Sequence, residues 1–258
     1  IDEGGAGIRL LTGTVTSPTL GAQIKAFLAA FPQARWHQYE PVNRDNASGG
    51  ARMAFGEALA PVYKFDAADV VVSLDSNFLE DGPGSVVYSR AFASRRDAEA
   101  GTMNRLYAIE STPTLTGAAA DHALHVRPSQ IETIARALAR KLGVDSPGLE
   151  VSDATQVQLV DEIAKDLQAH AGAGLVIAGD SQPAIVHAIA HAINEKLGNA
   201  GKTVTYIDPV EADPFDQNES LRTLVRDMAA GNVDTVIIVG VNPVYDAPAD
   251  LDFSSALQ

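Results

Sequence analysis

Short apolar segments alternate along the chain with longer segments whose apolar residues recur at helical spacing. The apolar segments are rich in β-branched residues, which is typical of strands buried on both faces of a sheet. They cover residues 8–15, 35–39, 69–74, 105–109, 123–127, 174–178, 203–207 and 234–239. This alternation predicts an α/β fold with two Rossmann-like lobes, each a doubly wound parallel sheet.

The helical segments between the strands carry ordinary start and stop signals. Thr16-Ser17-Pro18, for example, supplies a capping side chain and then a proline at the first helical position. The predicted helices cover residues 17–31, 44–56, 84–96, 129–142, 154–170, 184–197 and 219–230.

The segment from Gly143 to Gly148, GVDSPG, is the best candidate for a linker, because its turn residues separate two runs of strand–helix alternation. We therefore expect one lobe over residues 1–145 and a second over residues 149–258. The chain begins without Met, and the second lobe stops soon after a helix-like start. We expect it to be a piece of a longer polypeptide, truncated at the C-terminal end of the second lobe.

Polar residues follow two of the predicted strands. In an open α/β sheet, ligands lie just beyond the carboxyl ends of the strands. The first candidates for a binding role are Ser76, Asn77, Glu110, Ser111 and Thr112.

A weak internal repeat adds Asn242 to these candidates. Residues 69–83 match residues 234–248 at an offset of 165, with identical residues at Asp69/Asp234, Val71/Val236, Asn77/Asn242, Asp81/Asp246 and Pro83/Pro248. Two units with the same tip indicate similar halves that face a common cleft. The alternative is that both tips use Asn, Pro and Asp for turn formation alone.

Composition restricts the partners and cofactors. The formal charge is −14, which argues against nucleic acid and suits a basic protein partner better. The chain has no cysteine, so a disulfide or a cysteine-ligated iron–sulfur cluster within it is excluded. No apolar run approaches the length of a membrane span, and we expect no direct membrane insertion.

The stretch from Met103 to Ser129, MNRLYAIESTPTLTGAAADHALHVRPS, carries a family resemblance. It resembles the nucleotide-binding segment of molybdopterin oxidoreductases, where a strand ends in Asp-Pro-Arg and a later strand ends in Arg-Pro-Gly-Thr-Asp. The matching residues here are Glu110-Ser111-Thr112, Thr116, Ala120-Asp121 and Arg127-Pro128-Ser129-Gln130. With Asn43-Arg44-Asp45-Asn46, the chain is most similar to the molybdopterin-oxidoreductase-like iron–sulfur subunit of alternative complex III, of the Tat-variant-translocated type.

The departures from the family pattern fall at three functional positions. Asp75 replaces the Gly of a Gly-Ser-Asn turn that lies against the pterin nucleotide in the family. Thr112 replaces an arginine, and Asn43 occupies the position where many members carry the molybdenum-binding Cys or selenocysteine. A carboxylate beside a pyrophosphate is repulsive, and an amide is a poor substitute for a thiolate ligand. For Asn43 we favour a role at a helix start.

The resemblance implies a cofactor-less scaffold domain of a respiratory quinol-oxidising electron-transfer complex of the alternative complex III type. It further implies a periplasmic location peripheral to the inner membrane, contacts with other subunits of that complex, and iron–sulfur clusters elsewhere in the full-length chain. We expect the segment by itself to be non-catalytic, with a degenerate nucleotide pocket at Ser76, Asn77, Glu110, Ser111, Thr112 and Asn242.

Two alternatives remain open on the sequence. The first is a fragment of an active molybdenum or tungsten enzyme that binds molybdopterin guanine dinucleotide. The second is a free-standing Rossmann-like module that binds another nucleotide. A metal site within the chain is not expected: His187 and His191 lie four residues apart on a predicted helix, but no third ligand accompanies them.

Overall fold

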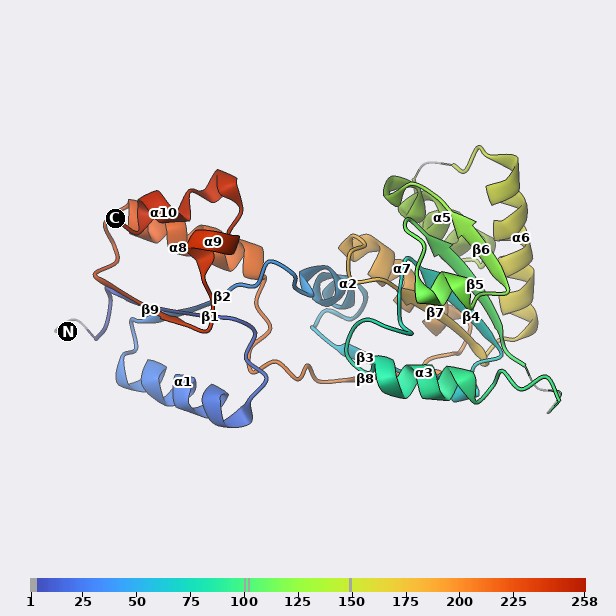
Figure 1. The fold of residues 1–258 in the computed structure, drawn as a ribbon, viewed down its shortest axis with the longest axis horizontal. Coiled ribbons are helices and arrows are strands. Elements are labelled where there is room, and N and C mark those ends of the chain that lie inside the picture. The colour runs from blue at the N-terminus through green and yellow to red at the C-terminus, as the bar shows by residue number, and fades with distance from the viewer. Residues whose placement is uncertain (1–3, 100, 102, 149) are drawn as a thin grey trace. The chain divides into compact units, whose positions relative to one another are not determined.

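The computed structural model describes residues 4–99, 101, 103–148 and 150–258. The chain forms two compact units (Figure 1): unit 1 consists of Ile1–Asp45 with Pro209–Gln258, and unit 2 of Asn46–Asp208. Each unit contains a parallel sheet flanked by helices, so the predicted α/β fold class is confirmed. Within the described ranges, no helix combines the length and apolar character needed to cross a bilayer.

Unit 1 has a three-stranded parallel sheet in the order β2-β1-β9. Helix α1 packs on one face through Ile24, which meets Leu10 and Trp36. The other face, with Leu11, packs against α8 and α10. The elements of unit 1 are β1 (Ile8–Thr12), α1 (Pro18–Ala30), β2 (Arg35–Gln38), α8 (Gln217–Ala229), β9 (Thr235–Val239), α9 (Pro243–Asp246), η2 (Ala249–Leu251) and α10 (Phe253–Ala256).

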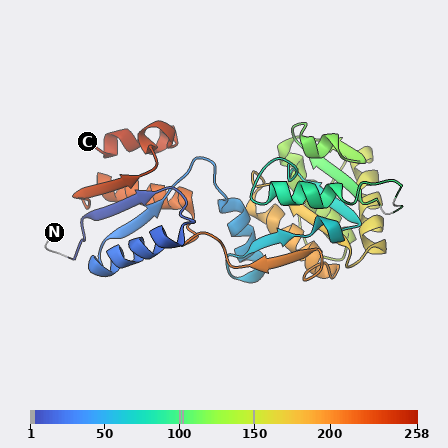
Figure 2. The ribbon, with the colours of Figure 1, turned by 60° about the horizontal axis from the view of Figure 1, so that its bottom comes forward.

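Unit 2 has a four-stranded parallel sheet in the order β6-β5-β4-β7 and a separate two-stranded sheet, β3-β8. Figures 1 and 2 show α3 on one side of the larger sheet, with α5 and α6 on the other. The elements of unit 2 are α2 (Asp45–Phe55, from the unit boundary), β3 (Ala60–Tyr63), η1 (Phe65–Ala67), β4 (Val70–Leu74), α3 (Ser85–Ala93), β5 (Arg105–Glu110), α4 (Leu115–Ala118), β6 (His122–His125), α5 (Pro128–Lys141), α6 (Ala154–Ala169), β7 (Gly174–Ala178), α7 (Ala184–Lys196) and β8 (Val204–Ile207).

Strand β4 lies inside the sheet, between β5 and β7, and its position explains why its sequence, VVVSL, is almost continuously apolar. Val70, Val72 and Leu74 pack into the core formed with α5, α6 and α7. Val71 points to the opposite face and packs with Phe65 and other aromatic side chains. Because both faces of the sheet are covered, a polar alternation along β4 would leave polar groups buried.

The predicted boundary between lobes at Gly143 to Gly148 is wrong. Strand β7 lies beyond this segment, yet it pairs in parallel with β4, so both belong to one sheet. Gly143, with φ of +75°, instead ends helix α5 in the left-handed conformation that glycine favours. The chain passes between the units after Asp45 and again after Asp208, and residues from both ends of the sequence build unit 1. Leu149, the first residue of the predicted second lobe, lies outside the described residues.

Two local features differ from the sequence expectations. Strand β3 is not among the predicted strands, and it pairs antiparallel with β8, which makes a small sheet outside the parallel scheme. Gly49-Gly50 lies inside helix α2 although glycine weakens helices. A Cβ at Gly50 would overlap His187 and the carbonyl of Ala184, so glycine permits the close approach of α2 and α7.

Candidate functional site

The carboxyl ends of β4, β5 and β7 in unit 2 are joined by the side chain of Asp75. Its Oδ1 accepts a 2.6 Å hydrogen bond from the backbone N–H of Ser111. Its Oδ2 accepts bonds from the Ser111 hydroxyl at 3.1 Å and from the Gln182 side-chain amide at 2.7 Å. Ser111 follows β5 and Gln182 follows β7, so one carboxylate connects three strand ends.

The backbone of Asp75 has φ of +60°, in the left-handed region where glycine is favoured and other residues are strained. Asp75 thus has a conformation in which glycine would be unstrained, and carries a carboxylate there. The strand end is also crowded on its other side. A Cβ at Gly179, which follows β7, would fall on the carbonyl oxygen of Asp75.

Glu110, the last residue of β5, is 3% exposed. Its Oε2 accepts a 2.7 Å hydrogen bond from the hydroxyl of Thr114. Its Oε1 makes no hydrogen bond within the described part of the chain, and lies 3.3 Å from Nδ1 of His125, an exposed residue of β6. A Cβ at Gly117 would overlap this carboxylate, so the glycine of α4 makes room for the Glu110 side chain.

Asn77 connects the loop after β4 to helix α4. Its Oδ1 accepts bonds from the backbone N–H of Thr116 at 3.3 Å and from the Thr116 hydroxyl at 3.2 Å. Its Nδ2 donates to the carboxylates of Glu80 and Asp81, at 2.9 and 3.1 Å. All hydrogen-bonding groups of the Asn77 amide are therefore engaged inside the unit.

The other predicted residues of this site have simpler surroundings. The backbone N–H of Ser76 donates to the hydroxyl of Ser73, which in turn donates to the Ser76 carbonyl. Ser111 is half-buried and makes two hydrogen bonds to Asp75, whereas Thr112 is exposed. The structure therefore places five of the six predicted residues in unit 2, around the ends of β4 and β5.

Asn242, the sixth predicted residue, lies in unit 1 after β9. It lines an open hollow of about 600 Å³ beyond the carboxyl ends of β2 and β9. The hollow is lined by Glu40, Pro41, Val42, Gly240, Val241, Asn242 and Asp246. Two of these side chains, Glu40 and Asp246, are acidic.

The internal repeat has a counterpart in backbone hydrogen bonding. The carbonyl of Asn77 accepts from the N–H groups three and four residues later, at 3.0 and 2.8 Å. The carbonyl of Asn242 does the same, at 2.9 and 3.1 Å. Asp69 and Asp234 each lie one residue before a strand, β4 and β9 respectively. The backbone N–H of Asp69 donates to the carbonyl of Ala173 before β7 at 2.7 Å, and that of Asp234 donates to the carbonyl of Gly7 before β1 at 2.8 Å. The two strand–turn segments thus share local geometry as well as sequence.

The residues around Asp75 do not fit the phosphates of a guanine dinucleotide. Asp75 and Glu110 place two carboxylates at the strand ends, and the Asn77 amide is hydrogen-bonded to two more, those of Glu80 and Asp81. Thr112 supplies no positive charge to balance them. A pyrophosphate would meet acidic groups where a phosphate site presents amides, glycine or cations.

Several residues of this site were missed by sequence reasoning. Gln182, Thr114 and His125 satisfy or approach the predicted residues. Gln182 and Thr114 lie on segments that have the composition of ordinary helix starts or turns. For Gln182 the signal was its position after β7, within GDSQP, because the ends of neighbouring parallel strands meet at one edge of the sheet.

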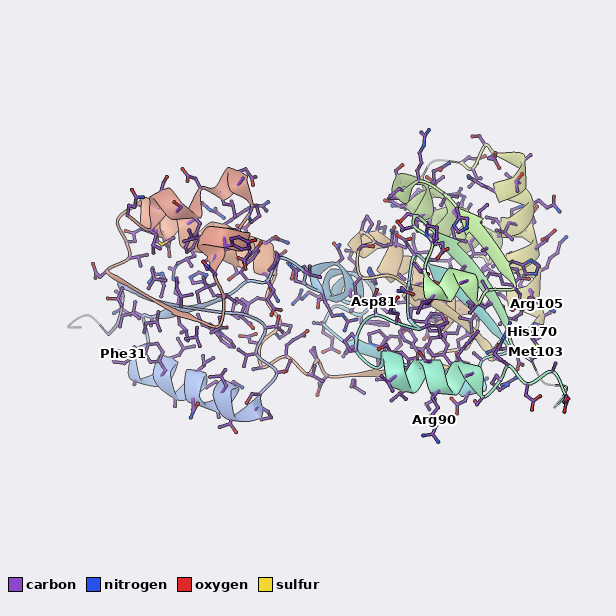
Figure 3. The ribbon with its side chains drawn as sticks, in the orientation of Figure 1. Phe31, Asp81, Arg90, Met103, Arg105 and His170 are labelled. Atoms are coloured by element: carbon purple, nitrogen blue, oxygen red, sulfur yellow. The ribbon has the colours of Figure 1, made fainter. Side chains whose placement is uncertain are left out.

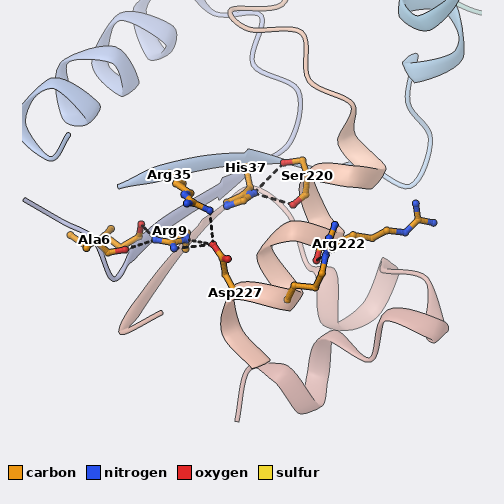
Figure 4. A network of polar contacts seen from close by, with 9 residues as sticks. Ala6, Arg9, Arg35, His37, Ser220, Arg222 and Asp227 are labelled. Carbon is orange, nitrogen blue, oxygen red and sulfur yellow. Dashed lines mark hydrogen bonds and ion pairs between the residues drawn. The ribbon is translucent and has the colours of Figure 1, made fainter. Parts of the chain in front are cut away.

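Unit 1 contains a buried charge network that the sequence did not suggest (Figure 4). The carboxylate of Asp227 on α8 accepts bonds from Nε and Nη2 of Arg9, at 3.0 and 2.9 Å, and from Arg35 at 3.1 Å. His37 lies beside this network, with Nδ1 3.0 Å from the Ser220 carbonyl. Burial lowers the pKa of His37, so its ring is neutral at pH 7.

The amino end of the unit 2 sheet carries a smaller hollow of about 200 Å³, near Met103, Arg105 and His170 (Figure 3). Its charged groups are paired within the chain. Arg105 donates to Asp166 at 2.6 Å, and His170 Nδ1 lies 3.3 Å from the same carboxylate. This hollow has the character of a structural ion-pair cluster.

His187 and His191 are both buried on α7, and Nδ1 of His191 lies 3.1 Å from the hydroxyl of Tyr206. Among the described residues, no three His, Asp or Glu side chains are grouped so as to hold a metal ion. Asn43 lies two residues before the start of α2, where its Oδ1 accepts a hydrogen bond from the backbone N–H of Asp45 at 3.1 Å.

The fold and these strand ends define an α/β protein with two parallel sheets. No family model matches the sequence, and no curated protein matches it. The fold is similar to a chain in the X-ray crystal structure of the formyltransferase/hydrolase complex (FhcABCD) from Methylorubrum extorquens in complex with methylofuran. The similarity covers 91% of this chain and 69% of that chain, with a TM-score of 0.53 and 15% sequence identity. At this identity the likeness concerns the fold alone.

Proposed function

We propose that this chain is a cofactor-less, molybdopterin-oxidoreductase-like scaffold domain of a respiratory quinol-oxidising electron-transfer complex of the alternative complex III type. The observation that carries the proposal is the position of the Asp75 carboxylate. It occupies the strand ends where the resembling enzymes need a glycine beside a nucleotide, and it is held there by Ser111 and Gln182.

The supporting argument is that the polar groups at these strand ends stabilise the fold. Asp75 joins three strand ends, Asn77 joins a loop to α4, and Glu110 is bonded to Thr114. A ligand would have to replace charge-assisted hydrogen bonds, each worth about 1.5–3 kcal/mol. Polar side chains that bond to one another within the fold suit a scaffold domain, whose role is to provide a stable surface for contacts with other subunits.

The partners under this proposal are the other subunits of a membrane-bound complex, with the domain peripheral to the membrane on the periplasmic side. The redox groups would be iron–sulfur clusters on another part of the full-length chain. The formal charge of −14 favours a basic contacting surface.

A second candidate is a scaffold role in an assembly of the formyltransferase/hydrolase type. The observation in its favour is the fold likeness over 91% of this chain. Under both candidates this chain is a non-catalytic α/β domain of a multi-subunit enzyme. The candidates differ in which subunits surround it.

The experiment is purification of the full-length protein with its native partners, followed by subunit identification and elemental analysis. We expect membrane-bound electron-transfer subunits, and molybdenum and tungsten well below one atom per chain. Subunits of a formyltransferase/hydrolase would favour the second candidate. Stoichiometric molybdenum or tungsten that remains with this domain after limited proteolysis would contradict both and support an active enzyme.

A further inference from the structure

The loop between β4 and α3 contains Asp81-Gly82, the one place in the sequence where glycine follows aspartate. Both residues are exposed, and Figure 3 labels Asp81. An aspartate carboxyl group lies close to the backbone nitrogen of the next residue, and such proximity makes attack between the two groups a unimolecular step. Glycine hinders that attack least, because it has no Cβ. The pair is therefore a candidate site of covalent rearrangement.

The surroundings of Gly82 leave the reacting nitrogen accessible. Its N–H makes no hydrogen bond to any residue that the structure describes. Gly82 has φ of +84°, and a Cβ built on it would meet no atom within 4 Å, so a ring that closes here has open space around it. The Asp81 carboxylate accepts one hydrogen bond among the described residues, from the Asn77 side-chain amide at 3.1 Å. A single exposed bond of this kind is readily broken.

Two other aspartates near strand ends lack this combination of features. Asp246 is the counterpart of Asp81 in the internal repeat, but alanine follows it, and the N–H of Ala247 donates to the carbonyl at the start of α9 at 3.1 Å. The Asp75 carboxylate accepts three hydrogen bonds, and the N–H of Ser76 donates to a serine hydroxyl at 3.1 Å. At both positions the nitrogen that would attack is already hydrogen-bonded.

We propose that Asp81 is a site of spontaneous isomerisation to isoaspartate. The nitrogen of Gly82 attacks Cγ of the protonated Asp81 carboxyl group, a C–N bond forms, and the carboxyl hydroxyl leaves as water with the amide proton. The succinimide ring then takes up one water molecule at the original main-chain carbonyl. This restores the mass and leaves the backbone running through Cβ and Cγ. The rearrangement needs no cofactor and does not depend on the function proposed above.

The rearrangement changes the start of helix α3. It adds one methylene group to the backbone before Gly82 and removes the Asp81 carboxylate from its hydrogen-bonded position. The turn that follows supports the first residues of the helix. The N–H of Ser85 donates to the Gly82 carbonyl at 3.3 Å, and the N–H of Tyr88 donates to the Gly84 carbonyl at 2.8 Å. A longer backbone at this point should weaken both bonds.

The test follows the full-length protein during incubation at neutral pH. Trypsin releases residues 65–90 as one peptide that contains both Asp75 and Asp81, and electron-transfer fragmentation distinguishes isoaspartate from aspartate in it. The peptide acetyl-Asn-Phe-Leu-Glu-Asp-Gly-Pro-Gly-Ser-amide, with the sequence of residues 77–85, is the unfolded reference. We expect isoaspartate at Asp81 to form at a rate within about tenfold of the reference, and at least about tenfold faster than at Asp75 or Asp246. A slower rate at Asp81, or a smaller difference from the other two aspartates, would overturn the proposal.

A matched variant tests the effect on α3. Asp81→Glu keeps the charge, but its extra methylene group requires a larger ring, so we expect no rearrangement in this variant. Hydrogen exchange of the Ser85 and Tyr88 amides should become faster in the incubated parent protein, in proportion to its isoaspartate content, and stay unchanged in incubated Asp81→Glu. Unchanged exchange in the rearranged parent protein, or an equal increase in the variant, would overturn the proposed effect on the helix.

Discussion

The carboxylate of Asp75 accepts a 2.7 Å hydrogen bond from the side-chain amide of Gln182, a residue 107 positions further along the chain. Asp75 follows β4 and Gln182 follows β7, and the two strands are parallel neighbours. The same carboxylate accepts two bonds from Ser111 after β5. One side chain therefore connects the strand ends at which an α/β sheet commonly binds its ligand.

Replacing Asp75 should lower stability in a defined order. Asp75→Ala loses all three accepted hydrogen bonds and keeps a Cβ at φ of +60°. Asp75→Gly loses the same bonds but removes the steric strain of a side chain in the left-handed conformation, which stabilises the folded state by about 1 kcal/mol. We expect losses in the free energy of unfolding of about 3 kcal/mol for Ala and about 2 kcal/mol for Gly, measured by urea denaturation. Thr112→Ala, an exposed control, should change it by less than about 0.5 kcal/mol. A Gly variant less stable than the Ala variant would contradict the backbone argument.

Gly179→Ala should be strongly destabilising. A Cβ at this position would fall on the carbonyl oxygen of Asp75, and backbone atoms cannot move as a flexible side chain can. Separating β7 from the end of β4 would also weaken the bond between Asp75 and Gln182. Overpacking of this kind costs about 2–4 kcal/mol. A thermal unfolding midpoint unchanged from the parent chain would show that the strand ends are more loosely packed than described.

Stability should fall on acidification because of His191. Burial first, and then repulsion from His187, lowers the pKa of His191 to about 4. The unfolded chain, with an ordinary value near 6.5, binds the proton more readily. The stabilising contribution is therefore present above about pH 6.5 and is lost as the pH falls towards about 4, to a limit of about 3 kcal/mol.

Urea denaturation of the parent chain and of His191→Gln between about pH 7 and about pH 4.5 measures this contribution. Burial also lowers the pKa of His37, but that histidine is present in both proteins and cancels in the difference. We expect the stability of the parent chain to fall more steeply than that of the variant. Parallel pH profiles would show that His191 is protonated equally in the folded and unfolded states.

The free energy of unfolding should fall markedly when Asp227 of the unit 1 network is substituted, and little when Arg35 is substituted. The Arg9 side chain is buried, and Asp227→Asn would leave its charge without a carboxylate partner. Such losses cost about 3 kcal/mol. The Arg35 side chain is 58% exposed, so Arg35→Ala should cost less than about 1 kcal/mol. Equal effects of the two substitutions on urea unfolding would mean that burial does not decide the strength of these pairs.

The sequence predicts the parallel strands and most helices of this fold well, because each carries its own periodic pattern. It does not predict which strands pair. Gly143 has the composition of a linker and in fact ends a helix, and the return of β7 to β4 is a long-range contact without a local signal. Strand β3, with a proline at its second position, has no apolar pattern long enough to identify it.

The candidate site was predicted in part for the same reason. Ser76, Asn77, Glu110 and Ser111 follow apolar strands and are recognisable by position. Their partners are not, since Gln182 and Thr116 become neighbours only when the sheet is assembled. Asn242 matches Asn77 in sequence and in local hydrogen bonding, but it lies in the other unit.

Calorimetric titration with GDP tests the central claim, that the strand ends of unit 2 are occupied by the chain's own side chains and no longer bind a guanine nucleotide. The parent chain should give a Kd weaker than about 1 mM, since Asp75 adds a carboxylate and Thr112 supplies no cation. The double variant Asp75→Gly with Thr112→Arg should bind more tightly than the parent chain if these two losses are the cause. A micromolar Kd for the parent chain, about −8 kcal/mol, would contradict the account and make Ser76, Asn77 and Glu110 the contacts of a working nucleotide site.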